Sequence, residues 1–403
     1  MAARFQLFCA AAMEMLATTE RRPDLIHLHE WTGASAAPLF REKYARGSLG
    51  STALVFTAHS LEHQGCDGAH VLDRLGLDRG RLHTDEKMRD PHNGGRVNLM
   101  KGAIAACDQM TTVSPTYASE GCTREDGFGL DGALSSSRRS NKLTGILNGI
   151  DYDAWDPSSD PHLRARYAVD EEADGETVLR ALEGKGVNKA ALQQECGLKL
   201  DGNVPLVACV GRLAAQKGVQ LIRHAIYRTV ERGGQFVLLG LPCDGGIRGE
   251  FENIAREFEG RESVSITLDF NEKLAHEVYA GADMLVMPSN YEPCGLAQMI
   301  AMRYGTAPVV RKTGGLRDSV DDVDDEEGGN GFSFRDANED GLNWALNRAI
   351  NYYYDQREWW NQALVPTCMA TDWSWATSAQ HYEIVYRAAV QAARERGEDW
   401  GLQ

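Results

Sequence analysis

Apolar runs alternate with amphipathic segments along almost the whole chain of 403 residues. In the first part of the chain, short apolar runs predict buried strands at residues 24–28, 53–57, 109–113 and 143–147. Segments with helical periodicity lie between these runs, at about 5–18, 32–47 and 95–106. Strands that alternate with helices in this way predict parallel sheets covered by helices, which is an α/β fold.

A second alternating series follows a polar stretch that is rich in Asp, Pro and Ser and begins near Asp151. Its strands are predicted at 205–210, 235–240, 263–267, 284–287 and 307–310, and its helices include 218–231 and 295–304. The acidic run 321–329 is expected to be a solvated surface loop.

This pattern predicts two Rossmann-like domains, an N-terminal domain at 1–150 and a C-terminal, nucleotide-sugar-binding domain at 151–375. The amphipathic tail from Trp373 to about Arg396 predicts a long helix, and we expect residues 376–403 to pack back on the first domain. Two such domains with a ligand cleft between them form the architecture called GT-B. Ligands in such folds bind at the carboxyl ends of the strands.

Composition narrows the classes of partner. A net charge of −16 disfavours nucleic acid and anionic membranes, and it is compatible with a neutral polymer. No apolar run approaches the roughly 20 residues of a membrane span. The first residues predict an amphipathic helix rather than a signal peptide, so we expect no targeting segment. The nine cysteines show no CxxC spacing, which favours reduced thiols in an intracellular protein.

The stretch 288–320 carries the strongest chemical signal. Glu292 follows a predicted strand and precedes a helix expected to begin at Cys294-Gly295-Leu296, whose free backbone N–H groups could bind sugar hydroxyls or phosphate oxygens. A carboxylate there could stabilise positive charge at an anomeric carbon, or it could simply cap the helix. One helix and one strand later, the turn Thr313-Gly314-Gly315-Leu316 would let a backbone approach a diphosphate closely, although a Gly-Gly pair can also be only a turn.

Arg212 and Lys217 lie on one loop after the predicted strand 205–210. That loop is at the carboxyl edge of a sheet, where a leaving diphosphate would need positive charge. The alternative is that both are solvated surface cations.

The first domain offers a second group of candidates at its strand ends. His59 ends one predicted strand, and His29-Glu30-Trp31 ends the preceding one. His27 and His29 alternate onto one face of that strand, but no third ligand is evident, so metal binding is not expected. Asn148 could also face the cleft.

These motifs resemble those of the starch and glycogen synthases, from about Phe5 to about Ala389. The resemblance is most specific at 212–240 and 288–320. The residues there are most like those of the plant and algal soluble starch synthases of class III and class IV. The family's His-Asn and His-Asp-Trp motifs are His59-Ser60 and His29-Glu30-Trp31 here. The family's N-terminal Lys-x-Gly-Gly-Leu motif has no match near residue 1, so we expect the first domain to be N-terminally truncated.

The resemblance implies a retaining transferase that moves glucose from ADP-glucose to the non-reducing end of an α-1,4-glucan, starch or glycogen, without a metal or other cofactor. It implies that Arg212 and Lys217 hold the donor phosphates and that Gly314 to Leu316 approach them. It further implies that Glu292 and the N–H groups of Cys294 to Leu296 hold the glucose, and that His59 contacts the sugar. His29, Glu30, Trp31 and Asn148 become acceptor-side candidates.

Two alternatives remain open at this stage. The departures at Glu30 and Ser60 and the missing Lys motif are compatible with a catalytically weak glucan-binding or granule-initiation homologue. A different GT-B enzyme that uses UDP-glucose is the third hypothesis. A plastid location is expected if the source is a plant or green alga, and the cytosol if it stores glucan elsewhere; other starch-synthesis proteins are possible partners.

Overall fold

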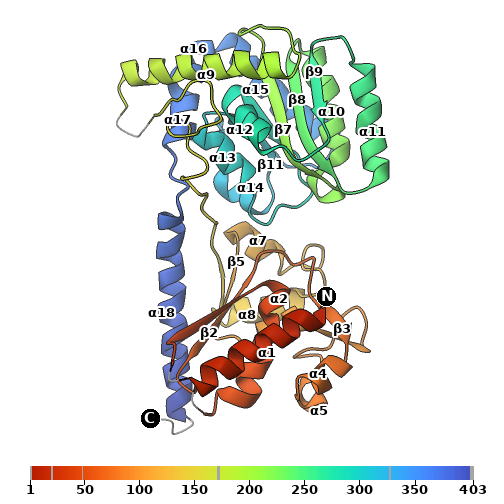
Figure 1. Ribbon diagram of the computed structural model, residues 1–403, viewed down its shortest axis with the longest axis vertical. Coiled ribbons are helices and arrows are strands. Elements are labelled where there is room, and N and C mark those ends of the chain that lie inside the picture. Colours follow the sequence, from red (N-terminus) through yellow and green to blue (C-terminus); the bar gives the residue numbers. More distant parts are fainter. Residues whose placement is uncertain (1, 20, 48, 170–172, 326–327, 400–403) are drawn as a thin grey trace. The chain divides into compact units, whose positions relative to one another are not determined.

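The computed structural model describes residues 2–19, 21–47, 49–169, 173–325 and 328–399. Its internal contacts define two compact units (Figure 1). Unit 1 comprises Met1–Leu147 and Ser378–Gln403, and unit 2 comprises Asn148–Thr377. Each unit contains its own parallel sheet.

Unit 1 is built on a four-stranded parallel sheet with the strand order β1-β2-β5-β6. The strands are β1 (Leu25–His29), β2 (Ala53–Ala58), β5 (Gln109–Thr112) and β6 (Leu143–Gly145). Every residue of β2 is buried, as expected for an apolar run in the middle of a parallel sheet. All four predicted strands of this part are therefore present, with shifts of one or two residues at their ends.

The helices of unit 1 are shorter and more irregular than the pattern predicts. They are α1 (Ala2–Thr18), α2 (Glu30–Ala34), α3 (Ala36–Leu39), the π-helical turn η1 (Phe40–Tyr44), α4 (His70–Arg74), α5 (Arg79–Leu82), α6 (Leu99–Ala106), α7 (Pro115–Glu120) and α8 (Asp131–Arg139). The expected single helix at 32–47 is thus divided into three pieces.

The helix expected to begin at residue 95 begins at Leu99 instead. Residues Arg96–Asn98 form β4, which pairs antiparallel with β3 (Cys66–Gly68). The Asn98 side chain accepts a hydrogen bond from the backbone N–H of Lys101 at 2.9 Å, which is the usual action of an N-cap residue. The local cap therefore decides where α6 begins.

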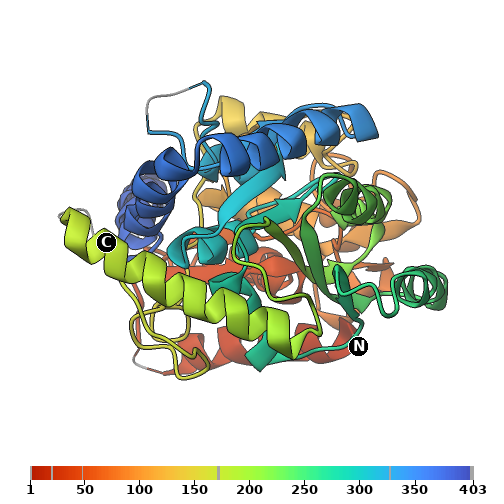
Figure 2. The same ribbon diagram turned by 90° about the horizontal axis from the view of Figure 1, so that it is seen from above.

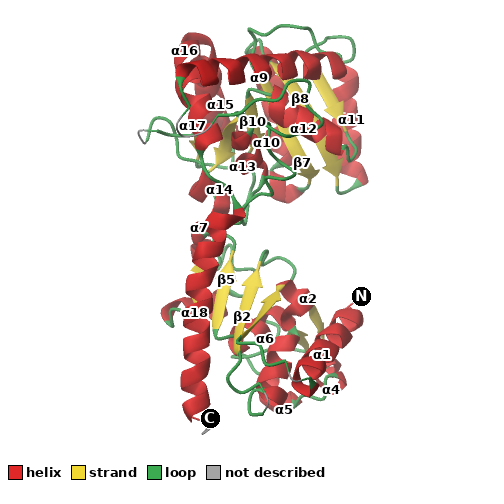
Figure 3. Ribbon diagram, turned by 60° about the vertical axis from the view of Figure 1, so that its left-hand side comes forward, coloured by secondary structure: helices red, strands yellow, loops and turns green. Residues whose placement is uncertain are grey.

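The C-terminal helix α18 (Trp375–Asp399) packs against the unit 1 sheet through its apolar stripe. Tyr382, Val385 and Ala389 share a buried cluster with Ala53 and Val55 of β2. Figure 3 shows the helix running along these strands. The last segment of the chain therefore completes the core of the first sheet.

Unit 2 is built on a six-stranded parallel sheet with the order β12-β11-β10-β7-β8-β9. The strands are β7 (Leu206–Leu213), β8 (Gln235–Pro242), β9 (Val264–Thr267), β10 (Met284–Met287), β11 (Ala307–Arg311) and β12 (Phe332–Phe334). The first five were predicted from their apolar runs, whereas the three-residue β12 was not.

Helices cover both faces of this sheet, with α9 on one side and α15 on the other (Figure 2). The helical elements of unit 2 are α9 (Gly175–Glu195), η2 (Ala215–Lys217), α10 (Val219–Glu231), α11 (Gly245–Glu257), α12 (Glu272–Gly281), α13 (Ala297–Arg303), α14 (Gly314–Ser319), α15 (Glu339–Asp355), α16 (Arg357–Trp359), the π-helical turn η3 (Trp360–Leu364) and α17 (Val365–Ala370). The pattern did not predict α9, because its buried face carries Lys185, Lys189 and Gln193.

The acidic run 321–329 is not simply solvated. Asp322 is buried and accepts hydrogen bonds from the backbone N–H and the hydroxyl of Ser333, at 2.7 and 2.8 Å. It also forms an ion pair with Arg348 of α15 at 2.5 Å. These contacts lower the pKa of Asp322 despite its burial. The surface-loop prediction is therefore wrong for this residue, and Glu326 and Glu327 lie outside the described residues.

Across the part of the chain that the structure describes, no helix is both long enough and apolar enough to cross a membrane.

Candidate active site

The strand order of unit 2 brings two loops together that are far apart in the sequence. From β7 the chain moves outward to β8 and β9, and it then returns to place β10 on the other side of β7. The loops that follow β7 and β10 therefore lie at the point where the winding of the sheet reverses. In open α/β sheets, this switch point is where ligands bind.

An ion pair between Lys217 and Glu292 joins these two loops. The Lys217 Nζ lies 2.5 Å from Glu292 Oε2, and the Ser289 hydroxyl donates to the same oxygen at 3.0 Å. The Glu292 side chain is only 6% exposed, against 24% for Lys217. A buried carboxylate needs such partners to offset its lost hydration. Its second oxygen, Oε1, has no hydrogen-bond partner among the described residues.

Backbone contacts hold the two loops in register. The backbone N–H of Asn290 donates to the carbonyl of Gln216 at 2.8 Å, and the Asn290 side chain donates to the carbonyl of Ala215 at 2.8 Å. Gly218 has a φ of 68°, and a Cβ there would lie 2.2 Å from the carbonyl oxygen of Pro288. The position of Lys217 opposite Glu292 is therefore set by the main chain.

The turn Gly314-Gly315 packs directly beneath the Glu292 loop. The backbone N–H of Gly315 donates to the carbonyl of Glu292 at 3.0 Å. A Cβ on Gly314 would lie 2.0 Å from the Glu292 carbonyl oxygen, and a Cβ on Gly315 would lie 2.0 Å from the Cys294 carbonyl oxygen. The sequence predicted that these two glycines let the backbone approach a diphosphate. In the structure, their missing side chains allow close contact with the backbone of the Glu292 loop. Thr313 and Leu316, which flank them, are both buried.

The segment Cys294-Gly295-Leu296 precedes α13 rather than beginning it, because Gly295 has a φ of 71° and the helix starts at Ala297. Leu296, and not Glu292, is the residue before the helix, so Glu292 does not cap it. The backbone N–H groups of these three residues donate to no described atom. They are therefore available to a ligand. Burial raises the pKa of the Cys294 thiol to about 12, which makes a thiolate nucleophile at this position unfavourable.

Gln298 is a site-supporting residue that the sequence reasoning missed. Its buried side-chain amide donates to the carbonyl of Gly295 at 2.8 Å and to the hydroxyl of Ser319 at 2.9 Å. It thereby ties the Glu292 loop to α14. A polar residue inside the otherwise apolar run AQMIAM was the signal that could have identified it.

Asn148 lies in unit 2, beside the residues expected to bind the donor. Its backbone N–H donates to the Cys294 thiol. Its side-chain oxygen is buried and has no partner among the described atoms. The structure thus groups Asn148 with the Glu292 loop.

Arg212 lies on the exposed end of β7, paired in register with Leu241 of β8. No described residue accepts a hydrogen bond from its guanidinium. Its charge is therefore free for an anion at this edge of the sheet. Phe270, in the loop after β9, is 77% exposed and lies at the same edge. The sequence reasoning did not identify Phe270, because a lone aromatic residue in a polar loop carries no periodic signal.

In unit 1, His29 and His59 meet at the carboxyl ends of β1 and β2. His29 Nδ1 lies 3.1 Å from His59 Nε2, and the two rings stack with their centroids 5.3 Å apart. Burial lowers the pKa of both imidazoles, and their mutual repulsion lowers that of His29 further. The pair is therefore neutral near pH 7 and can exchange hydrogen bonds with hydroxyl groups.

Glu30 and Trp31 lie beside this pair and make contacts within unit 1. Glu30 adopts a φ of 59°, and its carboxylate accepts hydrogen bonds from the backbone N–H groups of His59 and Ser60, at 2.5 and 2.9 Å. Burial raises the pKa of this carboxyl. The Trp31 ring packs edge-on against Phe5 and closely against Gly65. Within the described residues, no group of three or more His, Cys, Asp or Glu side chains could hold a metal ion.

Comparison with known proteins identifies the family. Residues 1–136 match the family model described as the starch synthase catalytic domain, and residues 194–363 match the group 1 glycosyl transferases. Glycogen synthase 2 of Methylococcus capsulatus is 43% identical over 388 residues, which cover 95% of this chain and 77% of that protein. The chain belongs to the starch and glycogen synthase family.

Another member of this family, the probable starch synthase 4, chloroplastic/amyloplastic, of Arabidopsis thaliana, is 46% identical over 396 residues. These cover 97% of this chain but only 37% of the length of that relative. The solved catalytic domain of starch synthase IV from Arabidopsis thaliana, bound to ADP and acarbose, has a TM-score of 0.88 and 46% identity. The match covers 96% of this chain and 77% of that one.

The fold extends beyond the starch and glycogen synthases. A sucrose-phosphate synthase from Thermosynechococcus elongatus has a TM-score of 0.56 at 20% identity, over 96% of this chain and 78% of that one. At that identity the likeness concerns the fold alone. The GT-B prediction is therefore confirmed, and so is the predicted family.

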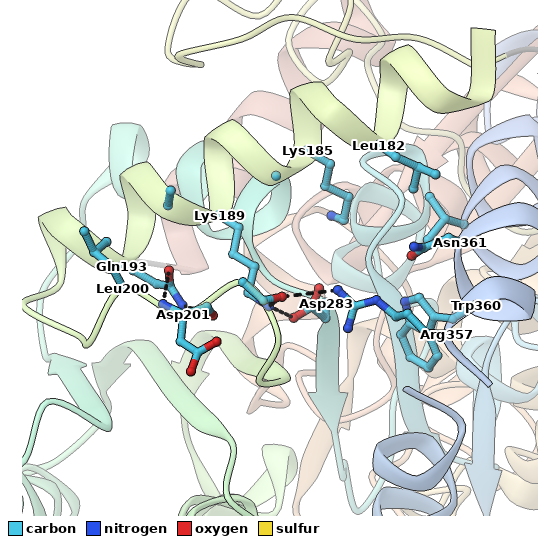
Figure 4. A pocket seen from close by; sticks show the side chains of 14 residues that line it. Leu182, Lys185, Lys189, Gln193, Leu200, Asp201, Asp283, Arg357, Trp360 and Asn361 are labelled. Atoms are coloured by element: carbon cyan, nitrogen blue, oxygen red, sulfur yellow. Dashed lines mark hydrogen bonds and ion pairs between the residues drawn. The ribbon is translucent and has the colours of Figure 1, made fainter. Parts of the chain in front are cut away.

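This family member also has a cavity of about 310 Å³ at the opposite edge of the unit 2 sheet, where β7 and β10 begin (Figure 4). Lys189 of α9 reaches Asp283 there, with Nζ 2.7 Å from Oδ2. The neighbouring Lys185 donates to the carbonyls of Ala280 and Tyr304 and to the Thr306 hydroxyl, and burial lowers its pKa to about 7. Both lysines thus join α9 to the body of unit 2, and their donors are already used.

Proposed function

We propose that this chain transfers glucose from ADP-glucose to the non-reducing end of an α-1,4-glucan with retention of configuration. The observation that carries the proposal is the Lys217–Glu292 pair at the switch point of the unit 2 sheet, with unpaired N–H groups beside it. The likeness to a starch synthase IV catalytic domain solved with ADP and acarbose supports it.

The proposed reaction needs no protein nucleophile. The bond between C1 of the glucose and the donor phosphate oxygen breaks, and a bond between C1 and the acceptor's 4-oxygen forms on the same face. The proton of that hydroxyl passes to an oxygen of the leaving diphosphate, so that ADP is released. Arg212 and Lys217 stabilise the negative charge of the diphosphate as it leaves.

Glu292 is proposed to act on the sugar. Oε2 is occupied by Lys217 and Ser289, whereas Oε1 is unpaired. Oε1 can accept a hydrogen bond from a glucose hydroxyl or stabilise the positive charge that develops at C1. The N–H groups of Cys294 to Leu296 supply the complementary donors.

Phe270 is proposed as the platform for the adenine base. Adjacent parallel strands are about 4.8 Å apart, so the loop after β9 lies roughly 10 Å from the loop after β7. A nucleoside diphosphate bound at Lys217 can place its base at about that distance. Base stacking explains why a large aromatic side chain would be 77% exposed.

In unit 1, His59 and His29 are proposed to serve the sugar and the acceptor through neutral imidazole hydrogen bonds. The carboxylate of Glu30, already bonded to the backbone of His59 and Ser60, then has a supporting role. This use of Glu30 also favours the second candidate, a glucan-binding homologue with weak or no catalysis. We further propose a plastid location, which the chloroplastic/amyloplastic relative supports.

The test is transfer of labelled glucose to glycogen, with ADP-glucose and UDP-glucose compared at equal concentrations. The variants are Glu292→Gln and, as a matched control, Glu250→Gln, which removes a half-buried carboxylate that is paired with Arg223 away from the Glu292 loop. Transfer that prefers ADP-glucose, is lost in Glu292→Gln and is kept in the control supports the proposal. Absence of transfer with retained glycogen binding selects the second candidate.

A further inference from the structure

We propose that Tyr386 of the C-terminal helix and His27 of β1 position the His29–His59 pair and select its tautomer. The inference rests on the proposed function of that pair. It assigns the C-terminal helix a role at the histidines of the first sheet, in addition to its packing.

His27 is fixed by hydrogen bonds at both ring nitrogens. Its Nδ1 lies 2.9 Å from the Tyr386 hydroxyl, and its Nε2 lies 2.7 Å from the Thr57 hydroxyl of β2. A neutral imidazole has one donor and one acceptor, and each hydroxyl can take either part. Both nitrogens are therefore satisfied, and the ring cannot turn without losing two bonds.

The fixed ring packs against His29 in a tilted arrangement. The centroids of His27 and His29 are 4.1 Å apart with an interplanar angle of 35°, and His29 in turn bonds to His59. The other side of His27 and His29 borders a cavity of about 510 Å³ that Phe5 and Phe8 also line. Because packing is open on that side, the hydrogen bonds of His27 decide how the stack is oriented.

The single proton between His29 and His59 makes the tautomer matter. If His29 donates from Nδ1, then neutral His59 carries its own proton on Nδ1 and presents a donor to a sugar hydroxyl. If His59 donates from Nε2, its Nδ1 becomes an acceptor instead. The dipole of the adjacent His27 ring, which its two hydrogen bonds hold in place, favours one of these two states, so its orientation sets what His59 offers.

Charge does not disturb this arrangement near pH 7. Burial, followed by repulsion from His29 and His59, lowers the pKa of His27 to about 3. Other titratable groups near these rings include the Tyr386 and Tyr382 phenols, the Glu30 carboxyl and Arg4, which lines the same cavity. With all three imidazoles neutral, the hydrogen bonds and the dipoles of the rings distinguish the tautomers.

The experiment combines a spectrum with kinetics on the full chain. Protein labelled with ¹⁵N in its histidine rings is compared as wild type, Tyr386→Phe and His27→Gln. The control is Tyr44→Phe, which removes a hydroxyl bonded to Glu14 in the same unit. We expect one fixed tautomer for His59 in the wild type and the control, and averaged ring signals in the other two variants. We also expect kcat to fall about fivefold in Tyr386→Phe and more in His27→Gln, with KM for ADP-glucose within about twofold.

The outcomes separate this inference from the proposed function. Unchanged His59 signals in both variants overturn the inference, even if kcat falls, because the effect is then merely structural. Altered His59 signals together with lower kcat support it. If the wild type transfers no glucose and the signals still respond, the proposed function fails and the positioning by Tyr386 and His27 stands.

Discussion

At the carboxyl edge of the unit 2 sheet an ion pair joins two loops, whereas at the carboxyl edge of the unit 1 sheet the histidines meet through neutral imidazoles. In unit 2, a buried carboxylate is paired with a lysine at 2.5 Å and the surrounding backbone is tightly bonded. In unit 1, three imidazoles lie in contact in a row, and burial lowers the pKa of each. A charged edge suits a nucleoside diphosphate, and a neutral edge suits the hydroxyl groups of a glucan.

The two sheet edges are also expected to differ in their tolerance of substitutions. Removal of one partner from a buried ion pair leaves the other charge buried without a partner, which destabilises the fold. Removal of one hydrogen bond from a neutral stack changes orientation more than stability.

Replacement of Glu292 by Gln is expected to lower kcat about 10²–10³-fold, because it removes the carboxylate proposed to act on the sugar and leaves Lys217 without its counter-charge. Steady-state transfer from ADP-glucose to glycogen measures this. The Glu250→Gln control is expected to stay near the wild-type rate. A Glu292→Gln enzyme within fivefold of the wild type would contradict the charged-edge account.

Replacement of Gly315 by Ala is expected to destabilise unit 2 by about 3 kcal/mol or more, since the added Cβ meets the Cys294 carbonyl oxygen at 2.0 Å. Urea unfolding measures the loss. Gly249→Ala in α11 is the matched control, because nothing lies within 4 Å of its Cβ position. That substitution is expected to be neutral or slightly stabilising. Equal unfolding midpoints for the two variants would show that the Gly-Gly turn does not need its close contact.

Replacement of Phe270 by Ala is expected to raise KM for ADP-glucose roughly tenfold with little change in kcat, because base stacking contributes about 1–3 kcal/mol. Phe270→Tyr retains the ring and is expected to behave like the wild type. The KM values of the three proteins, measured with glycogen in excess, decide the matter. A normal KM in the Ala variant would remove Phe270 from the donor site.

Acid is expected to destabilise unit 1 as the pH falls below about 6.5. The folded pKa of His27 is about 3, so below pH 6.5 the unfolded chain binds more protons than the folded one, and the free energy of unfolding decreases. Glu30 acts in the opposite direction in more acidic solution, because burial raises its pKa. Urea midpoints at pH 7.5 and 5.5 measure the loss, and His27→Gln should lessen it. An equal loss in that variant would show that His27 is not responsible.

Much of the fold could be predicted because its strands are continuous apolar runs. Residues 284–287 were predicted as a strand and are β10 with the same bounds. Elements stabilised by tertiary contacts could not be predicted in this way. The helix α9 buries Lys185 and Lys189, whose acceptors include groups 94 to 121 residues away in the sequence. The loop residue Asp322 is paired with Arg348 of α15.

The candidate site was predicted as separate motifs, but its internal bonds were not. Lys217 and Glu292 were both identified, yet their pairing across 75 residues depends on the order of the strands. Gly314 and Gly315 were identified because a Gly-Gly turn could admit a diphosphate. The structure shows that they approach the backbone of Glu292 and Cys294, which the sequence does not reveal. His27 was correctly placed on one face with His29, but its bond to Tyr386 spans 359 residues.

Calorimetric titration of ADP into the wild type and Lys217→Gln tests most directly whether the charged edge of unit 2 is a nucleotide site. Lys273→Gln, which removes an exposed lysine of α12 in the same unit, is the control. We predict that ADP binds the wild type and the control equally and binds Lys217→Gln at least about tenfold more weakly, because a charge-assisted contact to phosphate is lost. Equal affinity for ADP in all three proteins would contradict the account.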